Sequence, residues 1–519
     1  MKLFDTNQTR AWDAHTMEHE PIASVGLMNR AATAFADWFV SCWPDTERPV
    51  WVFAGTGNNG GDGVAVARLL HQRFYAPKVF VCAFGRKHSA DFDAQVSALP
   101  PHGAVDVHWL RSPDELPAVP VSAVLVDALF GSGLTRPLDG PWAETVHWLN
   151  KLPNDIAAID LPSGLFGDQR TPDDTVVHAT RTFSFETPKR AFFFPENADR
   201  VGEWAFGSIG LHSGYAEKTD TLFHFITRAD VQALVKKRPR FSHKGTYGHA
   251  LLLNGSRGSM GAAVLAAEAC LRAGAGLLTA HVPASGYDIL QTRVPEAMCS
   301  TDTDEGHWTE LPDLSRYSAI GAGCGIGQAT QTARVLQRLL QKTAVPLVLD
   351  ADALNLLATH PAWQARLPKN TVLTPHPKEF ERLFGSSGNN FERNDLQRAK
   401  AAELGVFIIL KGANTAIACP DGTCWFNSTG NPGMATGGSG DVLTGILTGL
   451  LAQGYPLRDA CLIGVFLHGL AGDIAADEKS QPGLIAGDLV ASLGMAWLAM
   501  TENRFGSETL TSGNRDPRE

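Results

Sequence analysis

Short apolar runs that alternate with helical patterns constrain the fold of this chain more than any other feature. In the first half these runs are "PVWVFA" (49–54), "KVFVCAF" (78–84), "AVLVDALF" (123–130) and "DIAAIDLPSG" (155–164). Helical patterns such as "DGVAVARLLHQRF" (62–74) lie between them. Strands that alternate with helices are typical of βαβ units. We therefore predict an α/β domain with a mainly parallel sheet.

The second half restarts this pattern after a polar interruption at residues 210–231. A helix of small residues is predicted at 261–276, and the strand-like runs are "GHALLLNGS", "GLLTAHVP", "YSAIGAG", "PLVLDADAL", "NTVLTPHP" and "VFIILKG". The chain has 519 residues, which suits two or three domains of roughly 100–200 residues each. We expect two α/β domains, residues 1–220 and 221–503, and a disordered tail at 504–519 that has little to bury.

Composition narrows the classes of function. A net charge of −10 argues against a nucleic-acid partner, and the one basic run, "KKRPRFSHK" (236–244), fits a solvated linker better than a binding patch. We find no signal peptide and no run of about 18 apolar residues, so we expect no membrane association. The eight cysteines show no C-x-x-C or zinc-like spacing. This pattern predicts free thiols and a cytoplasmic location.

The stretch "GTGNNGGDG" (55–63) carries a G-x-G-x-x-G pattern directly after the first predicted strand. A dinucleotide site of the dehydrogenase type also needs an acidic residue about 20 positions on. The next strand ends without one, which argues against a dehydrogenase. The glycines nevertheless allow a ligand to approach the backbone, and the following helix presents free N–H groups to phosphate. Asn58, Asn59 and Asp62 add side-chain oxygens that could bind substrate or a cation.

Two further strands of the first half end in polar groups. Asp127 is followed by a glycine turn at 131–133, and Asp160 is followed by Ser163. In open α/β sheets, ligands bind beyond the carboxyl ends of the strands. We therefore expect these three strand ends to form one site rather than three separate turns.

The second half contains the strongest single motif, "NPGMATGGSGDVLTG" (431–445). The backbone N–H groups of Gly438, Ser439 and Gly440 could form an anion hole at the start of a helix. Asp441 follows at once and could accept a proton from a hydroxyl group. The sequence lacks G-x-x-x-x-G-K-[ST], so this is not a P-loop.

The motifs "GNNGGDG", "DALFGSGL", "DLPSG" and "TPKR" resemble those of the NAD(P)H-hydrate epimerase family, across residues 8–215. This Rossmann-like family interconverts the R and S forms of NAD(P)H hydrated at C6 of the nicotinamide ring. The resemblance implies potassium ligands at Asn59, Asp127 and Ser163. It implies substrate contacts at Asn58, Asn59, Gly60, Gly61, Asp62, Gly131, Ser132, Gly133, Leu134, Thr135, Arg136, Pro137 and Asp160.

The epimerase reaction needs a proton carrier, because C6 is a carbinolamine carbon. Loss of its hydroxyl group gives an iminium-like species, and water can return to either face. We expect Asp160 to carry the proton. Lys189 is a second catalytic candidate, although a structural lysine fits this position equally well.

The second half resembles the NAD(P)H-hydrate dehydratase family of the ribokinase-like superfamily, across residues 227–500. The motifs are "HKGTYGHALLLNGS", "DADALN", "LTPHPKEF", "LKGANT" and "NPGMATGGSGDVLTG". The resemblance implies ADP contacts at Lys411, Gly412, Ala413, Asn414, Thr415 and Gly440. It implies a substrate site lined by Ala262, Gly323, His376 and Asp441, although Ala263 aligns as well as Ala262.

The implied dehydratase chemistry is kinase-like. The C6 hydroxyl group of the S form would attack the terminal phosphate of ADP with Asp441 as base, and phosphate would then leave as NAD(P)H is restored. Mg²⁺ would assist the transfer. Two alternatives remain open: a small-molecule kinase such as a hydroxymethylpyrimidine kinase, and a non-catalytic nucleotide-sensing module. We also expect a homo-oligomer, with a tetramer as one option.

Overall fold

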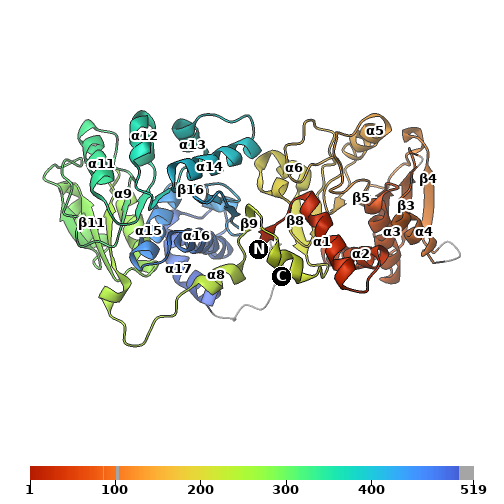
Figure 1. Cartoon of the computed structure of the whole chain (residues 1–519), viewed down its shortest axis with the longest axis horizontal. Helices are drawn as coiled ribbons and strands as arrows, with labels where there is room; N and C mark the ends of the chain where they lie inside the picture. The colour runs from red at the N-terminus through yellow and green to blue at the C-terminus, as the bar shows by residue number, and fades with distance from the viewer. Residues whose placement is uncertain (86, 101–103, 502–519) are drawn as a thin grey trace. The chain divides into compact units, whose positions relative to one another are not determined.

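The computed structural model of the chain describes residues 1–85, 87–100 and 104–501 (Figure 1). The chain divides into two compact units, one running from Lys2 to Thr221 and the other beginning at Leu222 and including Met1. It starts with a two-residue strand, β1 (Lys2–Leu3). The predicted tail at 504–519 lies outside the described residues.

The first unit is built on a parallel sheet of order β4-β3-β2-β5-β6-β7-β8. Its strands are β2 (Val50–Ala54), β3 (Pro77–Cys82), β4 (Asp106–Leu110), β5 (Val124–Ala128), β6 (Ile156–Ile159), β7 (Arg181–Phe185) and β8 (Glu203–Gly207). Three of the four predicted runs contain one of these strands, and the run at 78–84 overlaps β3. The prediction of an α/β fold with a parallel sheet is therefore confirmed for this unit.

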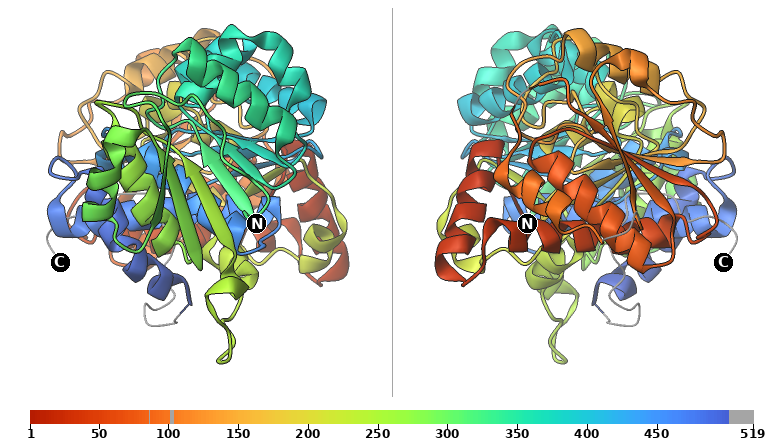
Figure 2. Two further views of the ribbon diagram at one scale, coloured as in Figure 1. Left: turned by 90° about the vertical axis from the view of Figure 1, so that its left-hand side faces the viewer. Right: turned by 90° about the vertical axis from the view of Figure 1, so that its right-hand side faces the viewer.

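Helices cover both faces of this sheet (Figure 2, right). The helices are α1 (Thr6–His19), α2 (Ser24–Cys42), α3 (Asn58–Gln72), α4 (Ala90–Ser97), α5 (Gly140–Leu149), α6 (Ala198–Val201) and α7 (Ser213–Lys218). Val52 packs in a cluster with α2 and α3, whereas its neighbour Phe53 packs on the other face with α5. This alternation is the period of two that a strand imposes on its side chains.

The second unit has a larger sheet, in which the strands follow the order β9-β18-β17-β16-β15-β14-β13-β10-β11-β12. Its strands are β9 (Phe223–Phe225), β10 (His249–Leu253), β11 (Leu277–Val282), β12 (Met298–Thr301), β13 (Ala319–Ala322), β14 (Leu347–Leu349), β15 (Thr371–Leu373), β16 (Phe407–Leu410), β17 (Ala416–Ala418) and β18 (Cys424–Phe426). All pairs from β16 to β12 are parallel, and β17 runs antiparallel to both of its neighbours.

Helices again form a layer on each face of the sheet (Figure 2, left). They are α8 (Arg228–Leu234), α9 (Met260–Arg272), α10 (Tyr287–Arg293), α11 (Thr330–Lys342), α12 (Asp352–Thr359), α13 (Pro377–Phe384), α14 (Asn390–Leu404), α15 (Ser439–Ala452), α16 (Leu457–Lys479) and α17 (Ala486–Thr501). One face is covered by α9, α15, α16 and α17, and the other by α11 to α14. This arrangement confirms the α/β prediction for the second half.

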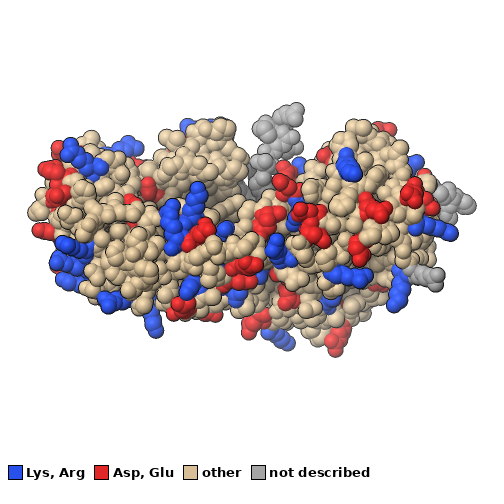
Figure 3. All heavy atoms as spheres, turned by 90° about the horizontal axis from the view of Figure 1, so that it is seen from above, with Lys and Arg blue, Asp and Glu red and all other residues tan. Residues whose placement is uncertain are grey.

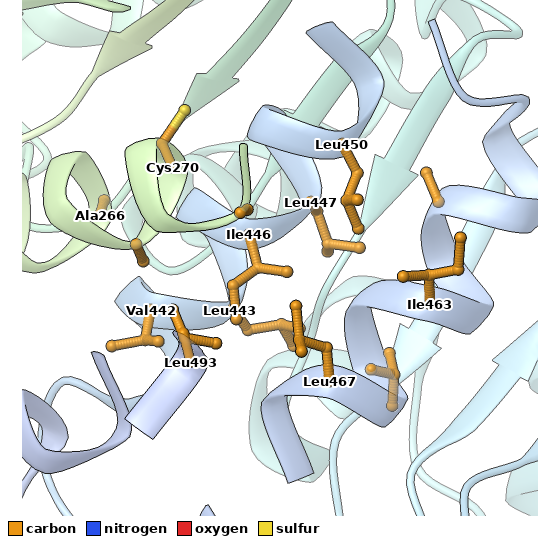
Figure 4. Packing of buried hydrophobic residues seen from close by; sticks show 14 of the residues in the cluster. Ala266, Cys270, Val442, Leu443, Ile446, Leu447, Leu450, Ile463, Leu467 and Leu493 are labelled. Atoms are coloured by element: carbon orange, nitrogen blue, oxygen red, sulfur yellow. The ribbon is translucent and has the colours of Figure 1, made fainter. Parts of the chain in front are cut away.

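Helix α15 lies at the centre of the core of this unit (Figure 4). Leu443, Ile446 and Leu447 pack among residues of α9, α16 and α17. A Cβ atom on Gly445 would lie 2.2 Å from the carbonyl oxygen of Ala266, so the two backbones approach too closely for any side chain. The small residues of α9 therefore serve the internal packing of α9 against α15.

Two predictions from composition can be compared with the structure: the absence of membrane association, and a basic run that serves as a solvated linker. In the described part of the chain, α16 is long and apolar enough to cross a membrane, but 67% of its most apolar window is buried, as in the core helix of a soluble protein. The basic run at 236–244 connects α8 to the rest of the unit, and Lys236 and Arg238 donate to backbone carbonyl oxygens. On the face drawn in Figure 3, basic and acidic side chains are interspersed among uncharged ones.

Candidate active sites

In each unit the sequence-predicted residues gather at the carboxyl edge of the sheet. In the first unit the strand order reverses between β2 and β5. Asn59 lies in the first turn of α3 after β2, Asp127 lies near the end of β5, and Asp160 directly follows β6. Such a reversal opens a crevice in which ligands of α/β proteins bind. The expectation that these strand ends lie at one edge is met.

The glycines after β2 have steric reasons to be glycine. A Cβ atom on Gly60 would lie 1.8 Å from the carbonyl oxygen of Gly55, and one on Gly55 would lie 2.3 Å from that of Leu129. Gly55 also donates its N–H to the carbonyl oxygen of Ala128 at 3.0 Å. The loop is thus held against the end of β5. Gly60 and Gly61 are buried, whereas Asn58 is exposed and Asn59 is half-buried.

Asp160 follows β6 in a strained conformation, with φ at +64° in the left-handed region. Its Oδ1 lies 3.0 Å from Lys189 Nζ and accepts hydrogen bonds from Ser184 Oγ and Phe185 N, each at 3.2 Å. Among the described residues, none donates to its Oδ2. Both members of the ion pair are buried. Strain of this kind is typical of functional positions, and Oδ2 is the oxygen left for a ligand.

Two more carboxyl groups lie within electrostatic reach of Asp160. Burial and the charge of Asp160 raise the pKa of Asp62 well above its usual range. Burial and the same charge raise the pKa of Asp13 on α1 to about 6. The sequence analysis assigned no role to Asp13, which stands in no recognisable motif. The first site therefore combines the ion-paired Asp160 with two carboxyl groups whose pKa values are raised above the ordinary range.

Asp127 and Ser163 contact each other directly. Ser163 Oγ donates to Asp127 Oδ1 at 2.6 Å, and Ser163 N donates to Asp127 Oδ2 at 2.7 Å. Phe130 N donates to Ser163 Oγ at 2.8 Å. The Asn59 side chain lies beside Gly131, and its Nδ2 is buried without a hydrogen-bond partner among the described residues. Burial raises the pKa of Asp127 to about 6.

The loop predicted to contact substrate, residues 131–137, is exposed or half-buried along its length. A Cβ atom on Gly133 would lie 3.3 Å from an Arg10 guanidinium nitrogen, so α1 places a positive charge beside this loop. The sequence analysis did not find Arg10. It lies more than a hundred residues before the loop, and no motif connects the two.

In the second unit, Asp350 and Lys411 form the centre of the site. Asp350 follows β14 and Lys411 follows β16, and their Oδ1 and Nζ atoms lie 2.7 Å apart. Thr444 of α15 donates to Asp350 Oδ2 at 3.1 Å. Burial opposes the charge of Lys411, but Asp350 and Glu379 outweigh it and raise its pKa. The sequence analysis quoted "DADALN" without selecting Asp350.

Asp441 lies in the first turn of α15, three residues after Gly438, which caps this helix. The φ of Gly438 is +94°, in the left-handed region that glycine adopts without strain. A Cβ atom on Gly440 would lie 3.2 Å from Lys411 Nζ and 3.3 Å from Asp350 Oδ2. The glycine turn, the ion pair and Asp441 therefore share one edge of the sheet.

The surroundings of Asp441 make its carboxyl group less acidic. Burial raises the pKa of Asp441 to about 6, and the charge of Asp350 adds to this effect. The thiol of buried Cys324 hydrogen-bonds to Asp441 and offsets part of the increase, as does the charge of Lys411. The carboxyl group is thus poised to exchange a proton near neutral pH.

A half-buried histidine of α16 supports the start of α15. His468 of α16 lies 2.9 Å from the carbonyl oxygen of Ser439 through its Nε2. Burial lowers the pKa of His468 to about 4, so the ring is neutral and donates from Nε2. Ser439 Oγ in turn donates to the carbonyl oxygen of Met434 at 2.8 Å. These bonds fix the turn that presents the N–H groups of the predicted anion hole.

His376 caps α13. Its Nδ1 accepts from Lys378 N at 3.1 Å, and the Glu379 side chain bonds back to His376 N at 2.9 Å. Burial lowers the pKa of His376, and the charges of Lys411 and Asp350 also act on it. Its ring therefore has a structural role and also lies within electrostatic reach of the site.

Other predicted residues line the same edge. Gly323 follows β13 with φ at +126°, and a Cβ atom there would lie 2.0 Å from the carbonyl oxygen of Asp350. Ala262 is half-buried beside Gly325, whereas Ala263 is buried in the core. Lys411 to Thr415 form the turn between β16 and β17, where Thr415 Oγ1 donates to the carbonyl oxygen of Gly412 at 3.0 Å.

Comparison with known proteins agrees with this architecture. Residues 24–191 match the family described as the YjeF-related protein N-terminus, and residues 250–493 match the family described as NAD(P)H-hydrate dehydratase. A curated relative from Coxiella burnetii, a bifunctional NAD(P)H-hydrate repair enzyme, is 35% identical over 95% of this chain and 98% of its own length. The chain belongs to the bifunctional NAD(P)H-hydrate repair enzyme family.

Further curated relatives carry the same description. The protein from Thermofilum pendens is 34% identical over 97% of both chains, and the one from Escherichia coli is 34% identical over 90% of this chain and 88% of its own. A crystal structure described as the ADP/ATP-dependent NAD(P)H-hydrate dehydratase from Bacillus subtilis, co-crystallised with ATP and Mg²⁺, is 35% identical and covers 53% of this chain and 98% of its own, with a TM-score of 0.48.

In this member of the family, the structure adds site residues that the sequence analysis did not select. They are Arg10 and Asp13 in the first unit, and Asp350, Thr444, Cys324 and His468 in the second. Those of the first unit come from α1, which is far from the other site residues in sequence. Asp350 and Thr444 stand within quoted motifs, so their polar character next to a strand end or helix start was a usable signal.

Proposed function

We propose that this chain repairs hydrated NAD(P)H in two steps. The epimerase domain, residues 1–220, interconverts the R and S forms of the hydrate. The dehydratase domain, residues 221–503, removes water from the S form at the expense of ADP and restores NAD(P)H. The observation that carries this proposal is similarity to bifunctional repair enzymes over nearly the whole chain, including both units. The kinase alternative leaves the first unit without a role, and the presence of both Asp160 and Asp441 argues against a non-catalytic sensor.

The epimerase step requires an acid for the departing C6 hydroxyl group and a base for the returning water. Asp160, paired with Lys189 at 3.0 Å, supplies the carboxylate that accepts the proton. Asp62, whose pKa burial and the charge of Asp160 raise well above its usual range, is the candidate acid that donates a proton to the leaving hydroxyl group. Two carboxyl groups held in different environments are a recurrent basis for such a division of roles. Arg10 and the 131–137 loop would bind phosphate.

Potassium would be held in the first unit by Asn59, Asp127 and Ser163. The residues fit a hard cation, because the set offers oxygen ligands and includes the buried Asp127 carboxylate. The unpartnered atom of Asn59 is its Nδ2, a hydrogen-bond donor, so the cation would bind the amide through the oxygen Oδ1. A bound cation would offset the negative charge that accumulates at this edge.

The dehydratase step begins with proton removal from the C6 hydroxyl group by Asp441. Its pKa of about 6 leaves it mostly ionised at neutral pH while keeping it an effective base. The hydroxyl oxygen bonds to the terminal phosphorus of ADP, and AMP leaves. Phosphate then departs from C6 as a proton is lost from C5, which forms the C5–C6 double bond. The N–H groups at Gly438 to Gly440 and the ammonium group of Lys411 would stabilise the phosphoryl charge.

Mg²⁺ would be held in the second unit by Asp350 together with phosphate oxygens. The residues fit, since Mg²⁺ in nucleotide sites commonly uses one or two carboxylates plus substrate phosphates, and Asp350 and Asp441 are close enough for their charges to interact. The ion would neutralise charge on the transferred group. The turn at 411–415 would contact ADP, while Ala262, Gly323 and His376 would line the nicotinamide pocket.

Homo-oligomerisation, a cytoplasmic location and the choice of ADP over ATP stay predictions. Small-molecule partners are NADHX or NADPHX and the nucleotide, and we expect neither nucleic acid nor membrane as a partner.

The deciding experiment supplies mixed R- and S-NADHX to the purified full chain and follows NADH absorbance with ADP, with ATP and without nucleotide. Wild type should convert both forms and should require nucleotide. Asp160→Asn should stop near the S fraction, apart from slow spontaneous epimerisation. Asp441→Asn should yield no nucleotide-dependent NADH.

Three other outcomes would contradict these assignments. Full epimerase activity in Asp160→Asn would overturn the role of Asp160. Absence of nucleotide-dependent NADH from the wild type would overturn the dehydratase proposal, and accumulation of a stable phosphorylated product would favour the kinase.

A further inference from the structure

Three potential metal ligands lie in the last two turns of α1. His15, Glu18 and His19 are spaced i, i+3 and i+4, which places them on one face of the helix. One ligand atom from each lies within 4.8 Å of the other two. Glu18 and His19 are exposed, so an ion can reach them from solvent.

The hydrogen bonding leaves the imidazole nitrogens ready to bind. His19 Nδ1 lies 2.9 Å from the carbonyl oxygen of His15, and because a carbonyl oxygen only accepts, Nδ1 carries the proton. Its Nε2 therefore keeps a lone pair. His15 Nε2 is buried and has no hydrogen-bond partner among the described residues. Backbone carbonyl bonds of this kind commonly orient histidines that ligate metals.

The three side chains lie close together without bonding to one another. The two rings have centroids 3.8 Å apart, one ligand atom from each residue lies within 4.8 Å of the other two, and no hydrogen bond joins these side chains within the described structure. The cluster also lies at the carboxyl end of α1, where the helix dipole favours positive charge. A bound ion would satisfy all of these groups at once.

A third ring, His212, lies 5.3 Å by centroid from each of the other two but is not part of the ligand set. Its Nδ1 accepts from Gly214 N at 3.3 Å to cap α7, so its proton is on Nε2. The donor set is thus two imidazole nitrogens and one carboxylate oxygen. Such a set suits borderline divalent ions, and three protein ligands leave a position for water.

We propose that His15, Glu18 and His19 form a surface site for a divalent transition-metal ion, represented by Zn²⁺. The site is independent of the repair activity proposed above. The site consists of ligand atoms from two turns of one helix. Metal binding at this site is measurable in the full chain without substrate.

The test is a Zn²⁺ titration of the metal-free full chain in competition with a chromogenic chelator. Wild type should bind one ion that the His15→Gln/His19→Gln variant binds at least about 10-fold more weakly, the size of effect that even outer-shell partners of metal sites show. His147→Gln is the matched control: His147 is an exposed histidine in the last turn of α5 with an exposed Glu144 at i−3, but it has no second histidine beside it on that helix. This control should retain wild-type affinity.

Two measurements keep the result decisive. His19→Gln changes an exposed side chain, so its thermal midpoint without metal should equal that of the wild type. Cu²⁺ bound to the wild type should show coupling to two imidazole nitrogens by electron paramagnetic resonance, and His19→Gln should show one. Equal Zn²⁺ affinity and stoichiometry in the wild type and the double variant, or unchanged nitrogen coupling in His19→Gln, would overturn the proposal.

Discussion

Asp160 and Asp441 reach their sites in different ways. Asp160 follows a strand with its backbone at φ +64°, and it is buried against Lys189 at 3.0 Å. Asp441 has no ion pair of its own among the described residues and occupies the first turn of a regular helix, where burial raises its pKa to about 6. An ammonium partner stabilises the charge of one carboxylate, whereas desolvation prepares the other to take up a proton. The same residue type is therefore suited to two kinds of proton transfer.

Asp441→Asn should produce the largest change, because the amide cannot accept the hydroxyl proton. We expect dehydratase kcat to fall about 100- to 10,000-fold, the usual contribution of a positioned base. Epimerase activity, followed by loss of one NADHX epimer on chromatography, should persist. Asp477→Asn, an exposed change on α16, serves as control. Loss of both activities in Asp441→Asn with an unchanged thermal midpoint would contradict the assignment of separate bases.

Lys189→Met should affect the first unit instead of the second. Removing the ammonium group leaves the buried Asp160 carboxylate without its partner, which costs about 3–5 kcal/mol for pairs of this kind. We expect a lower midpoint for the unfolding of the first unit and strongly reduced epimerase activity. Lys151→Met changes an exposed lysine and should do neither. Unfolding of the first unit at the wild-type midpoint would show that the ion pair does not have this role.

Alanine substitutions at Gly60 and Gly440 should have different effects, because the added methyl group meets different atoms. At Gly60 the new Cβ would meet a backbone oxygen at 1.8 Å, which cannot move without distorting the loop. At Gly440 it would meet the ends of the Lys411 and Asp350 side chains at 3.2 and 3.3 Å, which can shift. Gly60→Ala should therefore lower stability by about 1–3 kcal/mol. Gly440→Ala should fold normally and lose dehydratase activity. Calorimetry and NADH formation separate the two outcomes.

The sequence predicted what depends on local pattern. Apolar runs bounded by Gly, Asp or Ser correctly located strands such as β2, β5 and β14. The rule that ligands bind beyond the carboxyl ends of strands placed Asp127 and Asp160 at one edge of the first sheet. The glycine motif placed Asp441 at the start of a helix. It could not predict groups brought in by tertiary packing. Arg10 and Asp13 lie on a helix whose residues belong to no motif, and the neutral state of His468 depends on the packing around α16.

The dehydratase should show an acid limb that the pKa of Asp441 determines. Burial raises this pKa from 3.8 to about 6, so kcat/KM should rise with pH through about 6 and fall about tenfold per unit below it. Since the folded state holds the proton more tightly than the unfolded state, ionisation costs stability as pH rises through this range. Asp441→Asn should therefore be at least as stable as the wild type at neutral pH. A limb centred near 4 would contradict the raised pKa.

His376 offers the smallest effect and the finest test, because its ring caps α13 and also lies near the second site. Its Nδ1 accepts from backbone N–H groups, a task that an asparagine side chain performs well at this position. His376→Asn should keep the thermal midpoint, whereas His376→Ala should lose about 0.5–2 kcal/mol of stability with the cap. If the ring lines the nicotinamide pocket, His376→Asn will still raise KM for the hydrate. Wild-type KM in His376→Asn would assign this histidine to capping alone, and the second site would then depend on Asp350, Lys411 and Asp441.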